Sequence, residues 1–282
     1  MKRESFLSYY LDLRSSFELY FKRISKSHSA EDIHQLRVTL KKLRVIWSLA
    51  GHLCEGKLDK KEYQVLISKL FRSAGKVREA QLNSNTLKKY ELDYLRPYLK
   101  YLDRIRHVAH AELHEQVNAF DLDKSRWLDD KLVSALEKLP TGKVLKVAVG
   151  LISSETKKIT QLKAQRPNEE KLHKIRTHIK NIGELLVVVK QLDTQTNLDQ
   201  WQDHIKSLGQ RIGRWHDHVV LLASLESFSK KRLGKKGTEH IQDFVNRSRP
   251  REKARQKKIY QWVDKYIEQN SAQGVGQLLR TR

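Results

Sequence analysis

Residues 31–44 carry the sequence EDIHQLRVTLKKLR, and residues 170–180 carry EKLHKIRTHIK. The two stretches match at one constant offset along the chain, with a Glu, a His, an Arg and a Lys at the same spacing in each copy. The matched residues are Glu31, His34, Arg37 and Lys41 in the first copy and Glu170, His173, Arg176 and Lys180 in the second. The repeat predicts a chain of two equivalent halves, residues 1–140 and 141–282.

Both stretches have an apolar set with helical period. At about 100° per residue, these apolar side chains fall on one side of a helix, and the His, Arg and Lys lie directly beside them. Like charges at these spacings repel one another and cost stability unless an anion is present. Cations that flank a buried seam line the edge of a groove between helices, so the pattern predicts a negatively charged partner. The apolar residues are Ile33, Leu36, Leu40, Leu43 and Trp47, then Leu172, Ile175, Ile179, Ile182 and Leu186.

The composition agrees with such a partner. Lys and Arg number 56 and Asp and Glu 33, which gives a formal charge of +23 over 282 residues. An excess of this size indicates an anionic partner rather than a particular fold. The single cysteine, Cys54, excludes a disulfide framework within the chain and fits a reducing compartment. Since no apolar run approaches the ~20 residues that cross a bilayer and no secretory signal is evident, we predict a cytoplasmic protein.

Helical periodicity fills most of the chain, and no segment alternates with period two for long enough to form a strand. We therefore predict an all-α fold of two antiparallel four-helix bundles, related by a pseudo-twofold axis, with a basic central groove or channel. The break Leu139-Pro140-Thr141-Gly142 falls at the repeat boundary. A turn is expected at 234–237 and an interruption or bend at Pro250. Helices are expected at 4–24, 29–50, 58–74, 77–90, 95–120, 125–139, 143–164, from 168, 198–212, 215–229, and on to 268.

The repeated Glu-x-x-His, at Glu31 and His34 and again at Glu170 and His173, is also found in di-iron carboxylate bundles. Each Glu lies in the first turn after a capping residue, where a carboxylate stabilises the helix N-terminus. The Arg and Lys that follow would repel a divalent cation. We therefore predict no metal site at these positions.

His107, His110 and His114 share one helical face, which could in principle hold zinc. Arg104 and Arg106 lie beside them and favour a stripe that faces an anion or solvent instead. The chain has no Gly-x-x-x-x-Gly-Lys phosphate loop, no Gly-x-Ser-x-Gly elbow and no His-Glu-x-x-His. We predict neither an enzyme nor a cofactor.

Nucleic-acid binding is the main alternative, because a chain with a charge of +23 binds RNA or DNA at low salt whatever its function. Specific recognition usually needs aromatic side chains that stack on bases, or a helix that enters a groove. The five Trp and most Tyr are expected on apolar seams, as at Trp47. No RNA-binding or helix-turn-helix signature is present.

The pattern His-x-x-Arg-x-x-x-Lys-Lys-x-Arg at 34–44, its echo at 173–180, and the later pairs Arg78-Glu79 and His216-Asp217 resemble the conserved histidine α-helical domain family, CHAD. The resemblance covers residues 6–267. It implies a helical domain around a basic channel that binds inorganic polyphosphate without catalysis. With such a ligand, a cytoplasmic protein could lie at polyphosphate granules, although no motif encodes this location. The chain departs from the family pattern at Glu79, where Asp is usual, and at Asn181 and Gly183, where basic residues are usual. The second half is therefore expected to bind less strongly.

Polyphosphate is a flexible anion of high linear charge without bases. We expect it to be held by Arg forks and Lys point charges, with release of condensed counterions. Each of the two stripe histidines either gains a proton beside phosphate or fixes the stripe through a hydrogen bond. The predicted binding residues are His34, Arg37, Lys41, Lys42, Arg44, Arg72, Lys76, Arg78, Arg104, His173, Arg176, Lys180, Arg211 and Arg214.

Overall fold

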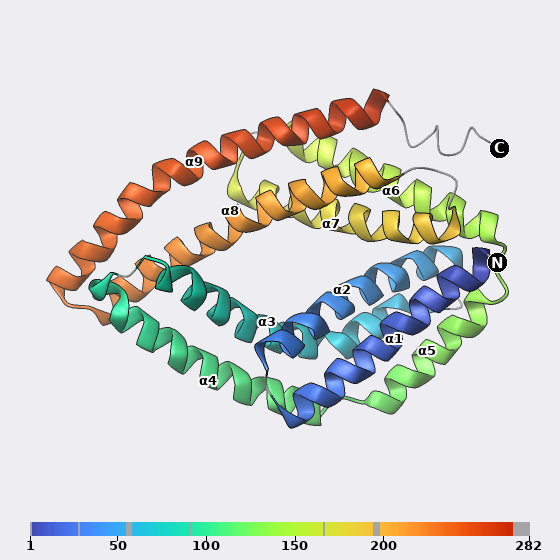
Figure 1. Cartoon of the computed structure of the whole chain (residues 1–282), viewed down its shortest axis with the longest axis horizontal. Helices are drawn as coiled ribbons and strands as arrows, with labels where there is room; N and C mark the ends of the chain where they lie inside the picture. Colours follow the sequence, from blue (N-terminus) through green and yellow to red (C-terminus); the bar gives the residue numbers. More distant parts are fainter. Residues whose placement is uncertain are drawn as a thin grey trace.

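The computed structural model describes residues 2–27, 29–54, 58–90, 92–165, 167–193 and 198–272, which are helical almost throughout (Figure 1). No strand occurs among these residues, so the predicted all-α class is confirmed. None of their helices is both long and apolar enough to cross a membrane. The α-helices are α1 (Lys2–Lys26), α2 (Ala30–Leu53), α3 (Lys60–Lys88), α4 (Arg96–Asn118), α5 (Leu122–Leu136), α6 (Thr141–Lys163), α7 (Glu169–Leu192), α8 (Asp199–Arg232) and α9 (Lys235–Ala272), with a 3₁₀ turn η1 (Asp93–Leu95) before α4.

The two stripe helices begin where the sequence predicts. Ser29 caps α2, because its Oγ accepts a hydrogen bond from the backbone N–H of Asp32 at 3.0 Å. Asn168 caps α7 in the same way, since its Oδ1 accepts from the backbone N–H of Lys171 at 2.8 Å. Each helix has acidic residues in its first turn, which satisfy the helix N-terminus.

Several predicted helix boundaries are wrong. The segments 58–74 and 77–90 form the single helix α3, and 198–212 and 215–229 form the single helix α8. The expected breaks fall at Gly75 and Gly213, but one glycine inside a helix costs only about 1 kcal/mol relative to alanine, which packing can outweigh. Helix α9 continues through Pro250 without interruption. Helix α8 ends at Arg232 and α9 begins at Lys235, so the turn between them is shorter than predicted.

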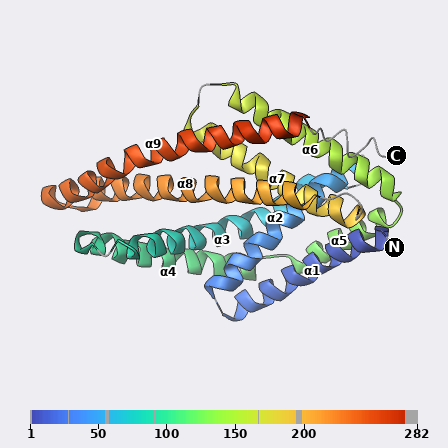
Figure 2. The same cartoon turned by 45° about the horizontal axis from the view of Figure 1, so that its top comes forward.

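Neighbouring helices pack in chain order, α1 to α4 in the first half and α6 to α9 in the second, while α5 packs against α1 and α3. The halves are joined at two places. At one, α1 and α2 pack against α6 and α7 around a large core drawn from both halves. At the other, α3, η1 and α4 share a second apolar cluster with α8 and α9. Between these joints, α2 and α3 lie opposite α7 and α8 (Figures 1 and 2). The pseudo-twofold relation and the division at residue 140 stay predictions.

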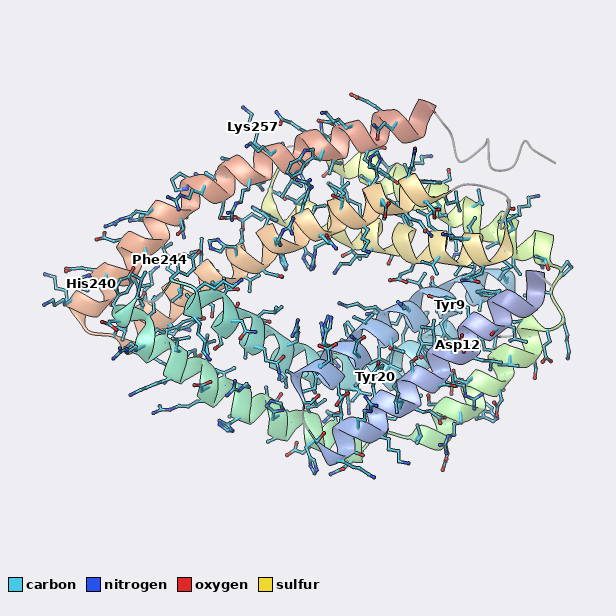
Figure 3. All side chains as sticks on the ribbon, in the orientation of Figure 1. Tyr9, Asp12, Tyr20, His240, Phe244 and Lys257 are labelled. Atoms are coloured by element: carbon cyan, nitrogen blue, oxygen red, sulfur yellow. The ribbon has the colours of Figure 1, made fainter. Side chains whose placement is uncertain are left out.

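Aromatic side chains lie at the second joint, where α3, η1 and α4 meet α8 and α9. The rings of Tyr90 and Phe244 meet edge-on with centroids 5.1 Å apart, and Tyr94 stacks on His240 at 5.7 Å. The Tyr90 hydroxyl also lies 3.0 Å from Nε2 of His218 on α8. Figure 3 shows His240 and Phe244 at this end of α9. These contacts link the end of α3 and η1 in the first half to α8 and α9 in the second.

A buried carboxylate fixes α7 against α6. Glu155 accepts hydrogen bonds from Nδ1 of His178 at 2.8 Å, Nδ2 of Asn181 at 2.9 Å and Nζ of Lys158 at 2.7 Å. Burial acts to raise the pKa of Glu155, but these three hydrogen bonds outweigh it and lower the pKa to about 2. Asn181 stands where the resemblance led us to expect a basic residue, and it holds α7 in place through the side turned to α6.

Candidate functional site

Four cations from the two copies of the repeat form one cluster, which we call the four-cation cluster: Arg37 and Lys41 from α2, and Arg176 and Lys180 from α7. Their proximity changes the ionisation of both lysines. Burial, followed by the charges of Lys180, Arg37 and Arg176, lowers the pKa of Lys41 to about 7. Burial and the two arginines lower the pKa of Lys180 to about 8, against the opposing charge of nearby carboxylates. The two stripes therefore face a common space.

Two glycines at equivalent positions make room for the two arginines. A Cβ atom at Gly75 on α3 would lie 2.6 Å from Nη1 of Arg37, and one at Gly213 on α8 would lie 3.3 Å from Nη2 of Arg176. Real Cβ atoms essentially never approach as closely as the first of these distances. In each half, the helix that follows the stripe thus uses a glycine to accept the arginine side chain.

The two arginines differ in their hydrogen bonds. Arg37 donates from Nη1 to the backbone oxygen of Phe71 at 2.7 Å, and its guanidinium lies 4.6 Å above the Phe71 ring. Arg176 has a buried Nε that finds no acceptor among the residues that the structure describes. A buried donor without an acceptor costs about 1–3 kcal/mol, and more when it is charged. Arg176 thus carries a buried charged donor that no described residue satisfies.

Among the described residues, almost none of the predicted site residues forms an ion pair with a carboxylate. In the described part of the chain, only one of the fourteen, Lys76, forms an ion pair, with Glu112 at 2.5 Å. Asp217 and Glu184 act on Lys180 through space but do not approach it within ion-pair distance. Burial raises the pKa of Glu184, and the positive charge of nearby lysines opposes this. Since none of the described carboxylates pairs with Arg37, Lys41, Arg176 or Lys180, these four keep an excess of positive charge.

Glu184 occupies the side of α7 that faces the first half. It lies close to Tyr9 of α1, and burial together with this carboxylate raises the pKa of the Tyr9 hydroxyl. Figure 3 shows Tyr9 on α1, at the joint with α2 and α7. The carboxylate thus marks the boundary between the basic site and the core of the joint.

Three histidines surround the arginines. The rings of His173 and His216 lie with centroids 4.6 Å apart, and burial followed by the charge of Arg176 lowers the pKa of both, to about 4 for His216. Burial and the charge of Arg78 lower the pKa of His34. All three histidines are therefore neutral at pH 7 while no anion is bound, and a neutral imidazole can still donate one hydrogen bond to phosphate.

A groove of about 750 Å³ opens beside the four-cation cluster. Helices α7 and α8 form most of its wall, and α2 contributes Lys42. Gly183 belongs to this wall, where a Cβ atom would lie 3.2 Å from Cγ2 of Ile205, so the glycine lets α7 pack closely against α8. The half that the sequence predicts to bind less strongly thus provides most of the concave surface. The cations along the groove are Lys42, Arg176, Lys180, Lys206 and Arg214.

The structure groups most of the predicted residues but separates some. Lys42, Arg176, Lys180 and Arg214 line the groove, Arg37 and Lys41 complete the cluster, and His34 lies near Arg78. Arg104 is exposed on α4, an outer helix of the first half, and is not part of the groove wall (Figure 1). The remaining predicted cations are exposed: Arg44 over the Phe71 ring, Arg211 over the Trp262 ring, and Arg72 and Lys76 on α3.

The prediction missed Lys206, Glu184 and Asp217. Lys206 could have been found from its spacing, because Lys206, Gln210 and Arg214 follow one another at i, i+4 and i+8 along one face of α8. The expectation that all five Trp lie on apolar seams is also wrong. Trp127 is 49% exposed on α5, with Nζ of Lys131 3.5 Å from its ring centroid.

Gly75→Ala tests whether the position of Arg37 matters for binding. We expect the added methyl group to displace the guanidinium and to weaken binding of an anionic ligand about tenfold, by loss of one charged hydrogen bond. Alanine favours a helix by about 0.5–1 kcal/mol over glycine, which offsets the loss of the hydrogen bond from Arg37 to Phe71, so the free energy of unfolding should change by no more than about 1 kcal/mol. Titration with ligand and chemical denaturation separate the two effects. A matched control is Gly150→Ala on α6, where a Cβ atom meets nothing within 4 Å; equal affinities of the two variants would contradict the role of Gly75.

Comparison with known proteins places this arrangement in a family. The sequence model of the CHAD domain matches residues 18–226 and 155–281. The crystal structure of the CHAD domain from the plant Ricinus communis superimposes with a TM-score of 0.71 at 17% identity, over 93% of this chain and 91% of that one. The structural likeness shows the fold alone, and no curated protein matches the sequence. Because the family model covers nearly the whole chain, the protein belongs to the CHAD domain family.

Proposed function

We propose that this protein binds inorganic polyphosphate in the basic groove and that it does so without catalysing a reaction. The observation that carries the proposal is the four-cation cluster, in which two helices bring Arg37, Lys41, Arg176 and Lys180 together without ion pairs among the described residues. Such a cluster repels itself until an anion arrives. Membership of the CHAD family supports the same ligand.

The chemistry of the groove favours polyphosphate over nucleic acid. A polyphosphate chain offers only charged oxygens, and the wall offers guanidinium and ammonium groups that bind such oxygens. None of the described residues that line the groove is aromatic, so this part of the wall provides no platform on which a nucleobase could stack. We expect the protein in the cytoplasm, including polyphosphate granules, where this ligand accumulates.

Competition at physiological salt tests the proposal against the nucleic-acid alternative. We expect long-chain polyphosphate to displace a labelled RNA at low concentration, while RNA does not displace labelled polyphosphate. The reason is that polyphosphate carries more charge per unit length than RNA and so releases more counterions, while the groove offers RNA bases no surface to stack on. Fluorescence anisotropy with each ligand labelled in turn measures both directions. RNA that displaces polyphosphate at equal phosphate concentration would show that the groove is a nucleic-acid site.

A further inference from the structure

A second basic surface lies outside the groove, on α9. The segment 247–258 contains seven cations and one acidic residue, Glu252. Glu252 is only 5% exposed and points at α8, where its Oε1 lies 3.0 Å from Nδ1 of His218. Figure 3 shows Lys257 on the outer side of α9, away from α8. The outward surface of the segment therefore carries charge of one sign, from Arg247, Arg249, Arg251, Lys253, Arg255, Lys257 and Lys258.

Most of these cations have no counter-charge. Arg249 pairs with Glu226 at 2.5 Å and Arg255 pairs with Glu252 at 2.7 Å. The other five are exposed and form no ion pair with any residue that the structure describes. A solvated helix surface normally mixes charges at i and i+4, and a stretch of one sign repels itself. No large apolar side chain is exposed along 247–258, so the surface has nothing to insert into a lipid bilayer.

The surface is continuous with the groove. Arg247, Arg251 and Lys258 lie at i, i+4 and i+11, which places them on one stripe along α9. Trp262, four residues further, continues the stripe, and the guanidinium of Arg211 on α8 lies 4.2 Å from its ring centroid. Arg214, three residues after Arg211 on α8, lines the groove. Cations therefore lead from the groove, around α8, and along α9.

We propose that this α9 stripe (Arg247, Arg251 and Lys258, continued by Arg211) binds the part of a polyphosphate chain that extends beyond the groove. The inference rests on the proposed function, because it assigns a second contact to the same ligand. Once one part of a chain occupies the groove, the next part is held at high effective concentration beside the stripe. A long chain therefore gains affinity from both surfaces, whereas tripolyphosphate occupies the groove alone.

The triple variant Arg247→Glu, Arg251→Glu and Lys258→Glu tests the stripe. All three side chains are exposed, so circular dichroism should match the wild type. We expect affinity for long-chain polyphosphate to fall at least tenfold, and the dependence of that affinity on salt to become shallower. Affinity for tripolyphosphate should stay within twofold of the wild type. The matched control makes the same change of charge at three exposed positions of the first half, at the end of α3 and on α4: Lys88→Glu, Lys89→Glu and Lys100→Glu. This control should keep its affinity for long-chain polyphosphate.

The outcomes separate this inference from the proposed function. If the stripe variant and the control lose long-chain affinity equally, the effect is one of overall charge and the stripe is not a site. If the stripe variant loses tripolyphosphate as well, α9 belongs to the primary site and the second contact is refuted. If duplex DNA occupies the stripe while polyphosphate stays bound in the groove, the stripe serves nucleic acid instead. Tripolyphosphate that binds equally to wild type and to Arg37→Glu, Lys41→Glu would refute the groove itself.

Discussion

The double variant Arg37→Glu, Lys41→Glu is expected to lose polyphosphate binding, with affinity falling more than about a hundredfold, while its helical circular dichroism signal persists. The two substitutions replace two of four positive charges with negative ones, so the net charge of the four-cation cluster falls to zero. The new carboxylates lie close to Arg176 and Lys180 and can pair with them, which removes these donors from the ligand too. Hydrogen bonds to charged groups contribute about 1.5–3 kcal/mol each, so the loss of two or more accounts for the size of the effect.

A control with the same change of charge elsewhere in the chain separates the effect of position from the effect of charge. Lys88→Glu, Lys100→Glu alters two exposed lysines, at the end of α3 and on α4, and neither forms an ion pair among the described residues. We expect this variant to bind within about threefold of the wild type at physiological salt, because exposed charges are screened beyond about 8 Å. Calorimetric titration with long-chain polyphosphate measures both variants. Undiminished affinity in the variant Arg37→Glu, Lys41→Glu would refute the site.

Affinity for polyphosphate is expected to fall between pH 7 and pH 9, by up to about a few hundredfold. In the free protein the pKa of Lys41 is about 7 and that of Lys180 about 8, so both lose their protons over this range. Bound phosphate stabilises the charged amines and raises both pKa values, so binding takes up protons at high pH. Each lysine then lowers the logarithm of the binding constant by up to about one per pH unit above its pKa in the free protein.

The conservative variant Lys41→Arg, Lys180→Arg tests this origin of the pH dependence. Arginine stays charged throughout the range, so we expect the variant to bind at pH 7 but to lose most of the decline toward pH 9. Titration calorimetry in buffers of different ionisation enthalpy counts the protons directly. An unchanged pH profile in the arginine variant would assign the effect to other groups.

The sequence predicts the features that depend on local pattern. The repeat at His34 and His173, the apolar seams beneath it and the caps at Ser29 and Asn168 follow from period and residue type, and the structure has them as expected. The convergence of the two stripes depends on fold and stays a prediction for the site as a whole; the groove wall does contain Lys42 of α2 together with Arg176 and Lys180 of α7.

Features that depend on contacts between distant segments could not be predicted. Gly75 and Gly213 have the local appearance of helix breaks, and only the packed arginines explain them. In the sequence, Asn181 appears only as the absence of an expected cation. The structure shows its role, because it donates a hydrogen bond to Glu155 on the neighbouring helix α6. The α9 stripe is visible in the composition of 247–258, but its continuity with the groove depends on the contact between Arg211 and Trp262.

The two joints between the halves have a consequence for how fast a ligand is captured. Because apolar packing joins the halves at both ends of the described fold, a hinge closure around a bound polymer would have to break one of these joints. We therefore expect the walls to be in place when a chain arrives, so that no shape change delays its capture. Association should therefore proceed at the rate of electrostatically steered diffusion, and the strength of the surrounding electrolyte should govern that rate.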